Sequence, residues 1–105
     1  DYLRLGSRDI DTEAEVATEP ELLANRPNPF SDRTIIGFIL PEACDAQLRI
    51  LDISGRELYR IDKSYPEGYN EELIQLRELR ATGILYYELT TPNGKLTRKM
   101  TPVAP

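Results

Sequence analysis

The pattern of apolar and polar residues along the chain predicts a series of short β-strands. Side chains alternate between the two faces of a strand, so a period of two marks a strand that is buried on one side. In the stretch 34–40, Ile36, Phe38 and Leu40 share one face. Further stretches of this kind are 46–53, 56–61, 69–76, 84–90 and 95–101.

The inward faces of these strands can be assigned from the sequence. Ile35 and Ile39 add apolar surface to the second face of the first strand, which we expect to be partly covered on both sides. Later strands are predicted to turn apolar residues inward at Ala46, Leu48 and Ile50, at Leu85, Tyr87 and Leu89, and at Leu96 and Met100.

Turn residues separate the strands at regular intervals. Ser54-Gly55 predicts one hairpin and Pro92-Asn93-Gly94 another, because Asn and Gly tolerate positive φ. Pro66-Glu67-Gly68 marks a further turn, and residues 77–82 have room for only one helical turn. The series predicts an all-β fold, an immunoglobulin-like antiparallel β-sandwich of about seven short strands.

A proline-rich stretch, residues 25–30 (NRPNPF), precedes the first predicted strand. Proline fixes φ near about −65° and disfavours helix for the residue before it, so the stretch is a stiff, extended lead-in. Phe30 can anchor its end in the core. We interpret Pro27, Asn28, Pro29 and Phe30 as a structural motif, and Gly55 and Gly83 as structural glycines of the turns.

Charge divides the chain into two parts. Residues 1–24 carry two basic and seven acidic side chains, whereas residues 25–105 carry eleven of each, so the first part holds the whole net charge of −5. The chain begins at Asp1 in what resembles the middle of a strand, as a fragment from the C-terminal end of a longer protein would. We expect residues 1–10 to end a preceding domain, residues 11–24 to be an acidic linker, and residues 25–105 to form the domain.

Composition excludes several classes of function. The chain has no histidine and a single cysteine, Cys44, which rules out an internal disulfide, a Cys/His nucleophile pair and a His-containing zinc site. We expect Cys44 to be a half-buried filler in a turn. No basic stripe suits nucleic acid, and no apolar run is long enough to span a membrane. We therefore expect no enzymatic activity, no cofactor and no metal.

Six sequence blocks in a fixed order resemble a known family. The match covers about residues 22–103, and its blocks are residues 25–30 (NRPNPF), 34–42 (TIIGFILPE), 51–56 (LDISGR), 68–70 (GYN), 82–87 (TGILYY) and 98–100 (RKM). This pattern is similar to the type A C-terminal sorting domain of the type IX secretion system of Bacteroidetes-type bacteria. Thr101-Pro102 departs from the family, which usually has an apolar pair after the Lys-Met.

The resemblance implies a secretion signal. Such a domain ends an exported cargo protein and directs it from the periplasm across the outer membrane, to the cell surface or the medium. The implied partners are the type IX translocon, a sortase-like cysteine peptidase that removes the domain by a cut in the acidic linker, and the N-terminal cargo domain.

Lys95, Arg98, Lys99 and Met100 are the candidate residues for recognition by the translocon. The segment from Lys95 to Pro105 has three basic side chains and no acidic one, and a positive edge strand can accept a partner strand. In the opposite interpretation, Met100 belongs to the core and the charges only keep an exposed edge from aggregating.

The alternative function is a non-catalytic immunoglobulin-like spacer or adhesion module of a surface protein. Sugar binding by such a module usually needs exposed aromatic rings, and the chain has no tryptophan. The predicted outward aromatic residues are Tyr59, Tyr65, Tyr69 and Tyr86.

Overall fold

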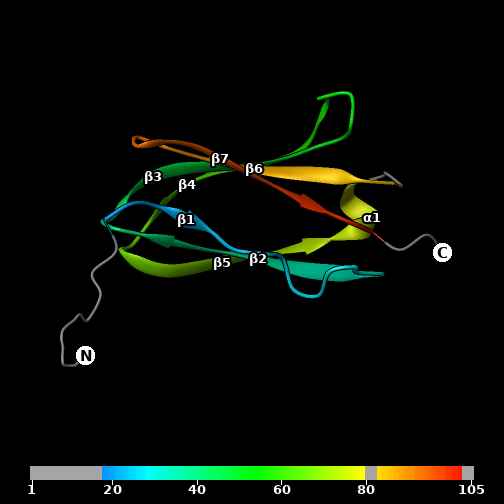
Figure 1. Ribbon diagram of the computed structural model, residues 1–105, viewed down its shortest axis with the longest axis horizontal. Coiled ribbons are helices and arrows are strands. Elements are labelled where there is room, and N and C mark those ends of the chain that lie inside the picture. The colour runs from blue at the N-terminus through cyan, green and yellow to red at the C-terminus, as the bar shows by residue number, and fades with distance from the viewer. Residues whose placement is uncertain (1–17, 80–82, 103–105) are drawn as a thin grey trace.

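The computed structural model of the chain describes residues 18–79 and 83–102 and folds as the predicted all-β sandwich (Figure 1). Two antiparallel sheets face each other, one of three strands in the order β1-β2-β5 and one of four in the order β4-β3-β6-β7. The elements are β1 (Glu21–Leu22), β2 (Arg33–Leu40), β3 (Cys44–Leu51), β4 (Glu57–Tyr65), β5 (Gly68–Gln75), α1 (Leu76–Leu79), β6 (Leu85–Thr91) and β7 (Gly94–Met100).

The core lies between the sheets, where the alternating apolar residues meet. Phe38 of β2 is fully buried and meets the ring of Tyr65 edge-on, with the ring centroids 4.9 Å apart. Every inward position predicted from the sequence is buried except Leu96 of β7, which is 36% exposed. Burial of these side chains is the main favourable contribution to folding of a sandwich of this size.

Polar side chains join the two sheets along both open sides of the sandwich. On one side, the Tyr87 hydroxyl donates a hydrogen bond to the Leu23 carbonyl oxygen over 2.6 Å. On the other side, Glu72 of β5 accepts from the Tyr65 hydroxyl at 2.6 Å and from Lys63 Nζ of β4 at 3.1 Å. The first contact joins β6 to the residue that follows β1, and the others join β4 to β5, so these bonds help to fix the position of one sheet on the other.

Several details of the sequence prediction are wrong. Tyr65 was expected to face outward, but it is only 4% exposed, because β4 continues past Ile61 and keeps its phase. Ile53 was assigned to a strand, yet it lies in the β3–β4 turn and is 77% exposed. Cys44 begins β3 instead of lying in a turn, although it is half-buried as expected.

The folded structure includes residues upstream of residue 25, where the predicted domain begins. Glu21 and Leu22, within the segment interpreted as linker, pair as β1 with Ile39 and Phe38 of β2. The predicted end of a preceding domain at residues 1–10 and the linker residues 11–17 lie outside the described residues. The single helical turn expected at 77–82 occurs as α1, and its predicted last residues, 80–82, also lie outside them.

Candidate recognition surface

The four candidate recognition residues lie on β7, at the edge of the four-stranded sheet. In the described residues, β7 pairs only with β6. Met100 is fully buried, so its side chain holds the strand on the core and is closed to a partner. Lys95, Arg98 and Lys99 are exposed and carry the positive charge of the edge.

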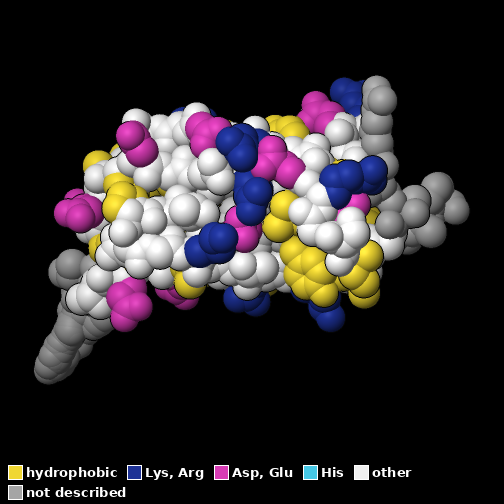
Figure 2. All heavy atoms as spheres, turned by 90° about the horizontal axis from the view of Figure 1, so that it is seen from above, with side chains coloured by type: hydrophobic (Ala, Val, Ile, Leu, Met, Phe, Trp, Pro, Cys, Tyr) yellow, Lys and Arg dark blue, Asp and Glu magenta, His cyan; other side chains and the backbone are white. Residues whose placement is uncertain are grey.

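Lys95 joins a charged cluster on the outer face of the sheet. Its Nζ lies 3.6 Å from Oε2 of Glu88, whose Oε1 accepts from Arg49 Nη2 at 2.6 Å. This bond, and a second one that Arg49 Nη1 donates to Glu57 Oε1, raise the pKa of Arg49 above its ordinary value. Figure 2 shows this face, on which Lys and Arg side chains gather across the middle with Asp and Glu side chains between them.

Arg98 and Lys99 are less engaged than Lys95. Arg98 lies on the inward-facing side of β7, opposite Tyr87, and its Nη1 donates to the Leu22 carbonyl oxygen at 3.3 Å. Lys99 lies opposite Tyr86, and no carboxylate of residues 18–79 or 83–102 comes within ion-pair distance of it. The described surface therefore leaves these two cations without an acidic partner.

The proline motif is hydrogen-bonded to Thr101, the residue that follows β7. The Phe30 amide donates to the Thr101 carbonyl oxygen at 3.1 Å, and the Thr101 amide donates to Asn28 Oδ1 at 3.0 Å. Phe30 also forms a parallel bridge with Pro102, and its side chain is buried. We call this set of bonds the terminal contact. It joins the first and the last of the family blocks, and it uses Thr101 and Pro102, where the chain departs from the family.

The buried side chain of Asn25 stabilises the proline motif by hydrogen bonds, a role that the sequence analysis missed. It is 3% exposed, and its Nδ2 donates to the Pro27 carbonyl oxygen and to Thr34 Oγ1, each at 3.1 Å. Thr34 Oγ1 in turn donates to the same carbonyl oxygen at 2.9 Å. The sequence signal for this role was an asparagine directly before the two X-Pro bonds, Arg26-Pro27 and Asn28-Pro29, which are both cis.

The two structural glycines occupy positions that need positive φ. Gly55 has φ of 91° in the β3–β4 turn and Gly83 has φ of 89° before β6. Asp52 stabilises the first turn by accepting from the amides of Ser54 and Arg56, each at 2.9 Å. These bonds, with that from the Ser54 hydroxyl as the largest contribution, lower the pKa of Asp52.

A groove follows β7 on the side of the sandwich where β1 lies. Glu19 and Pro20 form one wall of a depression of about 300 Å³ whose other wall is Asn93 to Leu96. A second depression, of about 270 Å³, continues between Pro20–Leu22 and Leu96–Arg98. The described chain therefore begins directly beside the start of β7.

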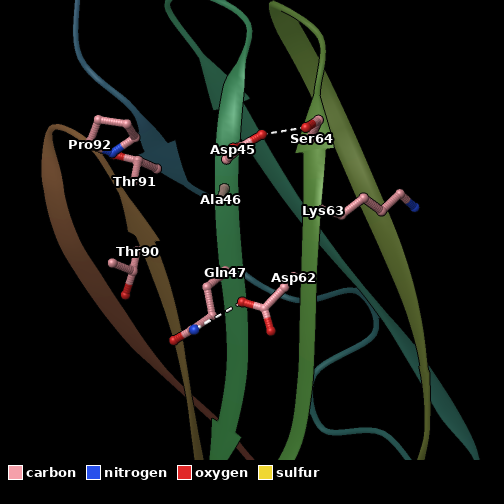
Figure 3. A pocket seen from close by; sticks show the side chains of 9 residues that line it. All are labelled: Asp45, Ala46, Gln47, Asp62, Lys63, Ser64, Thr90, Thr91 and Pro92. Carbon is pink, nitrogen blue, oxygen red and sulfur yellow. Dashed lines mark hydrogen bonds between the residues drawn. The ribbon is translucent and has the colours of Figure 1, made fainter.

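A shallow depression on the outer face lies at the same end of the sandwich, beside the β6–β7 turn. It has a volume of about 550 Å³, and Figure 3 shows Gln47 bonded to Asp62 and Asp45 bonded to Ser64 across β3 and β4. Lys63 points away from both pairs in this view. The described residues contain no cluster of three or more groups that could hold a metal ion, and burial raises the pKa of Cys44, which disfavours its thiolate.

No helix among the described residues is long and apolar enough to cross a membrane. Comparison with curated proteins and with solved structures gave no match. A family model described as "Secretion system C-terminal sorting domain" matches residues 26–102, from the proline motif to the terminal contact. The chain therefore belongs to the family of C-terminal sorting domains of the type IX secretion system.

Proposed function

We propose that the domain is recognised through the open edge of β7, where Lys95, Arg98 and Lys99 guide an acidic strand of the translocon into place. The family is a C-terminal sorting signal for type IX secretion and has no known catalytic role, so the cargo is exported to the cell surface or the medium. Passage through the periplasm is part of the proposal.

The exposed, one-sided pairing of β7 carries this proposal. An edge strand presents unpaired N–H and C=O groups to which a partner strand can bond. Three cations around that edge attract an acidic partner, and electrostatic attraction raises the rate and specificity of docking more than its affinity. Met100 and the terminal contact support the edge by fixing the position of β7 on the core.

Export of a reporter tests the role of Lys99. Residues 11–105 are fused to a periplasmic reporter in a host with type IX secretion, as wild type, Lys99→Glu and Arg33→Glu. Arg33 is an exposed basic residue of β2, so its variant makes the same charge change on the other sheet. We expect Lys99→Glu to lower export about tenfold, as the loss of about 1.4 kcal/mol of docking energy would.

The same substitutions leave the fold intact on this proposal. Changes at exposed positions usually alter the free energy of unfolding by no more than ~0.5 kcal/mol, which thermal unfolding of the purified domains measures. Normal export of the Lys99→Glu fusion, or an equal loss from Arg33→Glu, would place the recognised surface elsewhere and favour a spacer or adhesion module.

We also propose that a sortase-like cysteine peptidase separates the cargo from the domain by a cut in the acidic linker. A protease needs an accessible, extended backbone. Because β1 pairs with β2 and Leu22 is only 5% exposed, the downstream part of the linker is protected, and the proposed cut lies upstream of β1. The peptidase and the cargo domain are thus the proposed partners beside the translocon.

A further inference from the structure

The two faces of β7 present different chemistry at its open edge. Lys95, Thr97 and Lys99 lie on the outer face of the sheet. Leu96 and Arg98 lie on the inner face, because the register pairs them with residues of β6 that are buried in the core, and both line the groove beside β1. A strand added to this edge places each of its side chains on the same face as the β7 residue opposite it. Its side chains therefore meet two different surroundings.

The groove favours apolar side chains and disfavours acidic ones. Its two depressions, of about 300 and 270 Å³, share Pro20 and Leu96, and Leu96 is 36% exposed. Glu19 lines the first depression and Glu21 the second. An apolar side chain would gain burial against Leu96 and Pro20. A carboxylate in the same place would lose hydration and be repelled by the two glutamates.

The outer face of the edge has the opposite preference. Lys95 Nζ lies 3.6 Å from Glu88, but the same carboxylate also accepts from Arg49, so the two cations share one acid. Among the residues that the structure describes, no carboxylate pairs with Lys99. Acidic side chains on this face would neutralise the excess positive charge.

We propose that the β7 edge and its groove select an amphipathic strand, acidic on its outer face and apolar toward the groove. This inference rests on the proposed function and adds the chemistry of the partner strand. The acids stand opposite Lys95 and Lys99, and an apolar side chain fills the groove opposite Leu96. Opposite Arg98, which lines the second depression together with Glu21, a neutral amide fits.

The opposite signs of the two surroundings set the register of the partner. Slipping a strand by one residue moves every side chain to the other face. The acids would then face Glu19 and Glu21, and the apolar side chain would lie beside the lysines. The groove thus supplies a selectivity that attraction to the lysines alone lacks, because charge attraction does not distinguish the two registers.

Two synthetic peptides with blocked ends test this selectivity on the purified full chain. The matched peptide, Thr-Glu-Gln-Thr-Val-Glu-Thr, is as long as β7. Aligned antiparallel, it sets its glutamates opposite Lys99 and Lys95 and its valine opposite Leu96. The swapped peptide, Thr-Glu-Gln-Val-Thr-Glu-Thr, has the same composition and charge, but its valine shares a face with the glutamates.

NMR titration, followed through the amide shifts of β7, measures both affinities. We expect the matched peptide to bind the wild type about tenfold more tightly than the swapped one, which corresponds to about 1.4 kcal/mol. Leu96→Thr removes apolar surface from the groove but keeps a good strand former, so it should abolish this preference. Leu73→Thr is the matched control, at an apolar residue of β5 that is 48% exposed, and should keep it. Thermal unfolding checks that both variants fold.

Equal binding of the two peptides by the wild type would overturn the inference, because charge alone would then account for binding. Amide shifts of β7 with neither peptide would overturn it as well, if they are absent throughout the titration. Loss of export by Lys99→Glu together with equal peptide binding would leave the proposed function standing without the amphipathic strand. A preference for the matched peptide with normal export of Lys99→Glu would support the strand site but assign it to a partner other than the translocon.

Discussion

At the scale of the residue, the two faces of β2 contribute unequally to stability. Phe38 is fully buried and packs edge-on against Tyr65, whereas Ile35 is only partly covered on the outer face of the sheet. Removing a side chain costs the burial of its atoms and the cavity that it leaves, so the better-covered residue should cost more to truncate.

Phe38→Ala should therefore lower the free energy of unfolding by about 3–5 kcal/mol. Ile35→Ala should cost less, because its site is already partly open to water. Urea unfolding of the two purified variants measures both costs. Equal losses would contradict the assignment of Ile35 to the outer face.

Strand faces could be predicted from the sequence, but one end of β4 could not. Ala46, Leu48 and Ile50 face inward as expected, because strict alternation leaves one choice of face. In β4 the inward position after Ile61, where the predicted strand ends, is Lys63, a charged residue. The structure instead lets Lys63 reach Glu72 at the open side, which continues the alternation to Tyr65.

At the scale of the element, β7 is paired along its length with β6 and is bonded just beyond its end to the proline motif. The terminal contact joins residues 73 positions apart, Asn28 and Thr101, through a hydrogen bond to a side-chain oxygen. No local pattern encodes such a distant pair. The sequence therefore predicted that the proline motif is rigid, but not that it is bonded to the end of β7. The edge position of β7 depends on the order of strands in the sheet, which the sequence does not show, so at that stage it was a hypothesis.

Asn28→Ala removes the acceptor of the Thr101 amide and should cost about 0.5–1.5 kcal/mol of unfolding free energy. Hydrogen exchange at Thr101 should become faster in the same variant. Asn28→Asp keeps an acceptor oxygen at the site and serves as the matched control, with exchange close to that of the wild type. Unchanged exchange in Asn28→Ala would show that the terminal contact does not hold the end of β7.

At the scale of the whole molecule, the edges of the sandwich differ in charge. The β4 edge carries both signs, with Arg60, Asp62 and Lys63, and the β5 edge carries Glu71 and Glu72. Among the described strands, β7 is the edge with cations alone, as its residues Gly94–Met100 include no acid. Glu71 and Glu72 of β5 are already paired with Arg26 and Lys63, so an acidic strand would be attracted to β7 more than to β5. The charge distribution therefore favours one orientation of the domain on a partner.

The boundary between linker and folded domain is the last prediction. Within residues 11–24, a protease that cuts after glutamate has sites at Glu13, Glu15 and Glu21, because the bond after Glu19 precedes Pro20 and resists cutting. The bond after Glu21 lies in β1, whose next residue, Leu22, is buried against the core, so this bond must be freed by local opening before it can be cut. Under brief digestion of the full chain, we expect mass spectrometry to find cuts at the upstream sites before any cut after Glu21.

Leu22→Ala weakens β1 and should speed the cut after Glu21 without changing the rate of cutting at the upstream sites. Equally fast cutting of the wild type after Glu13 and after Glu21 would show that β1 does not bound the folded domain, and the peptidase cut could then fall anywhere in residues 11–24.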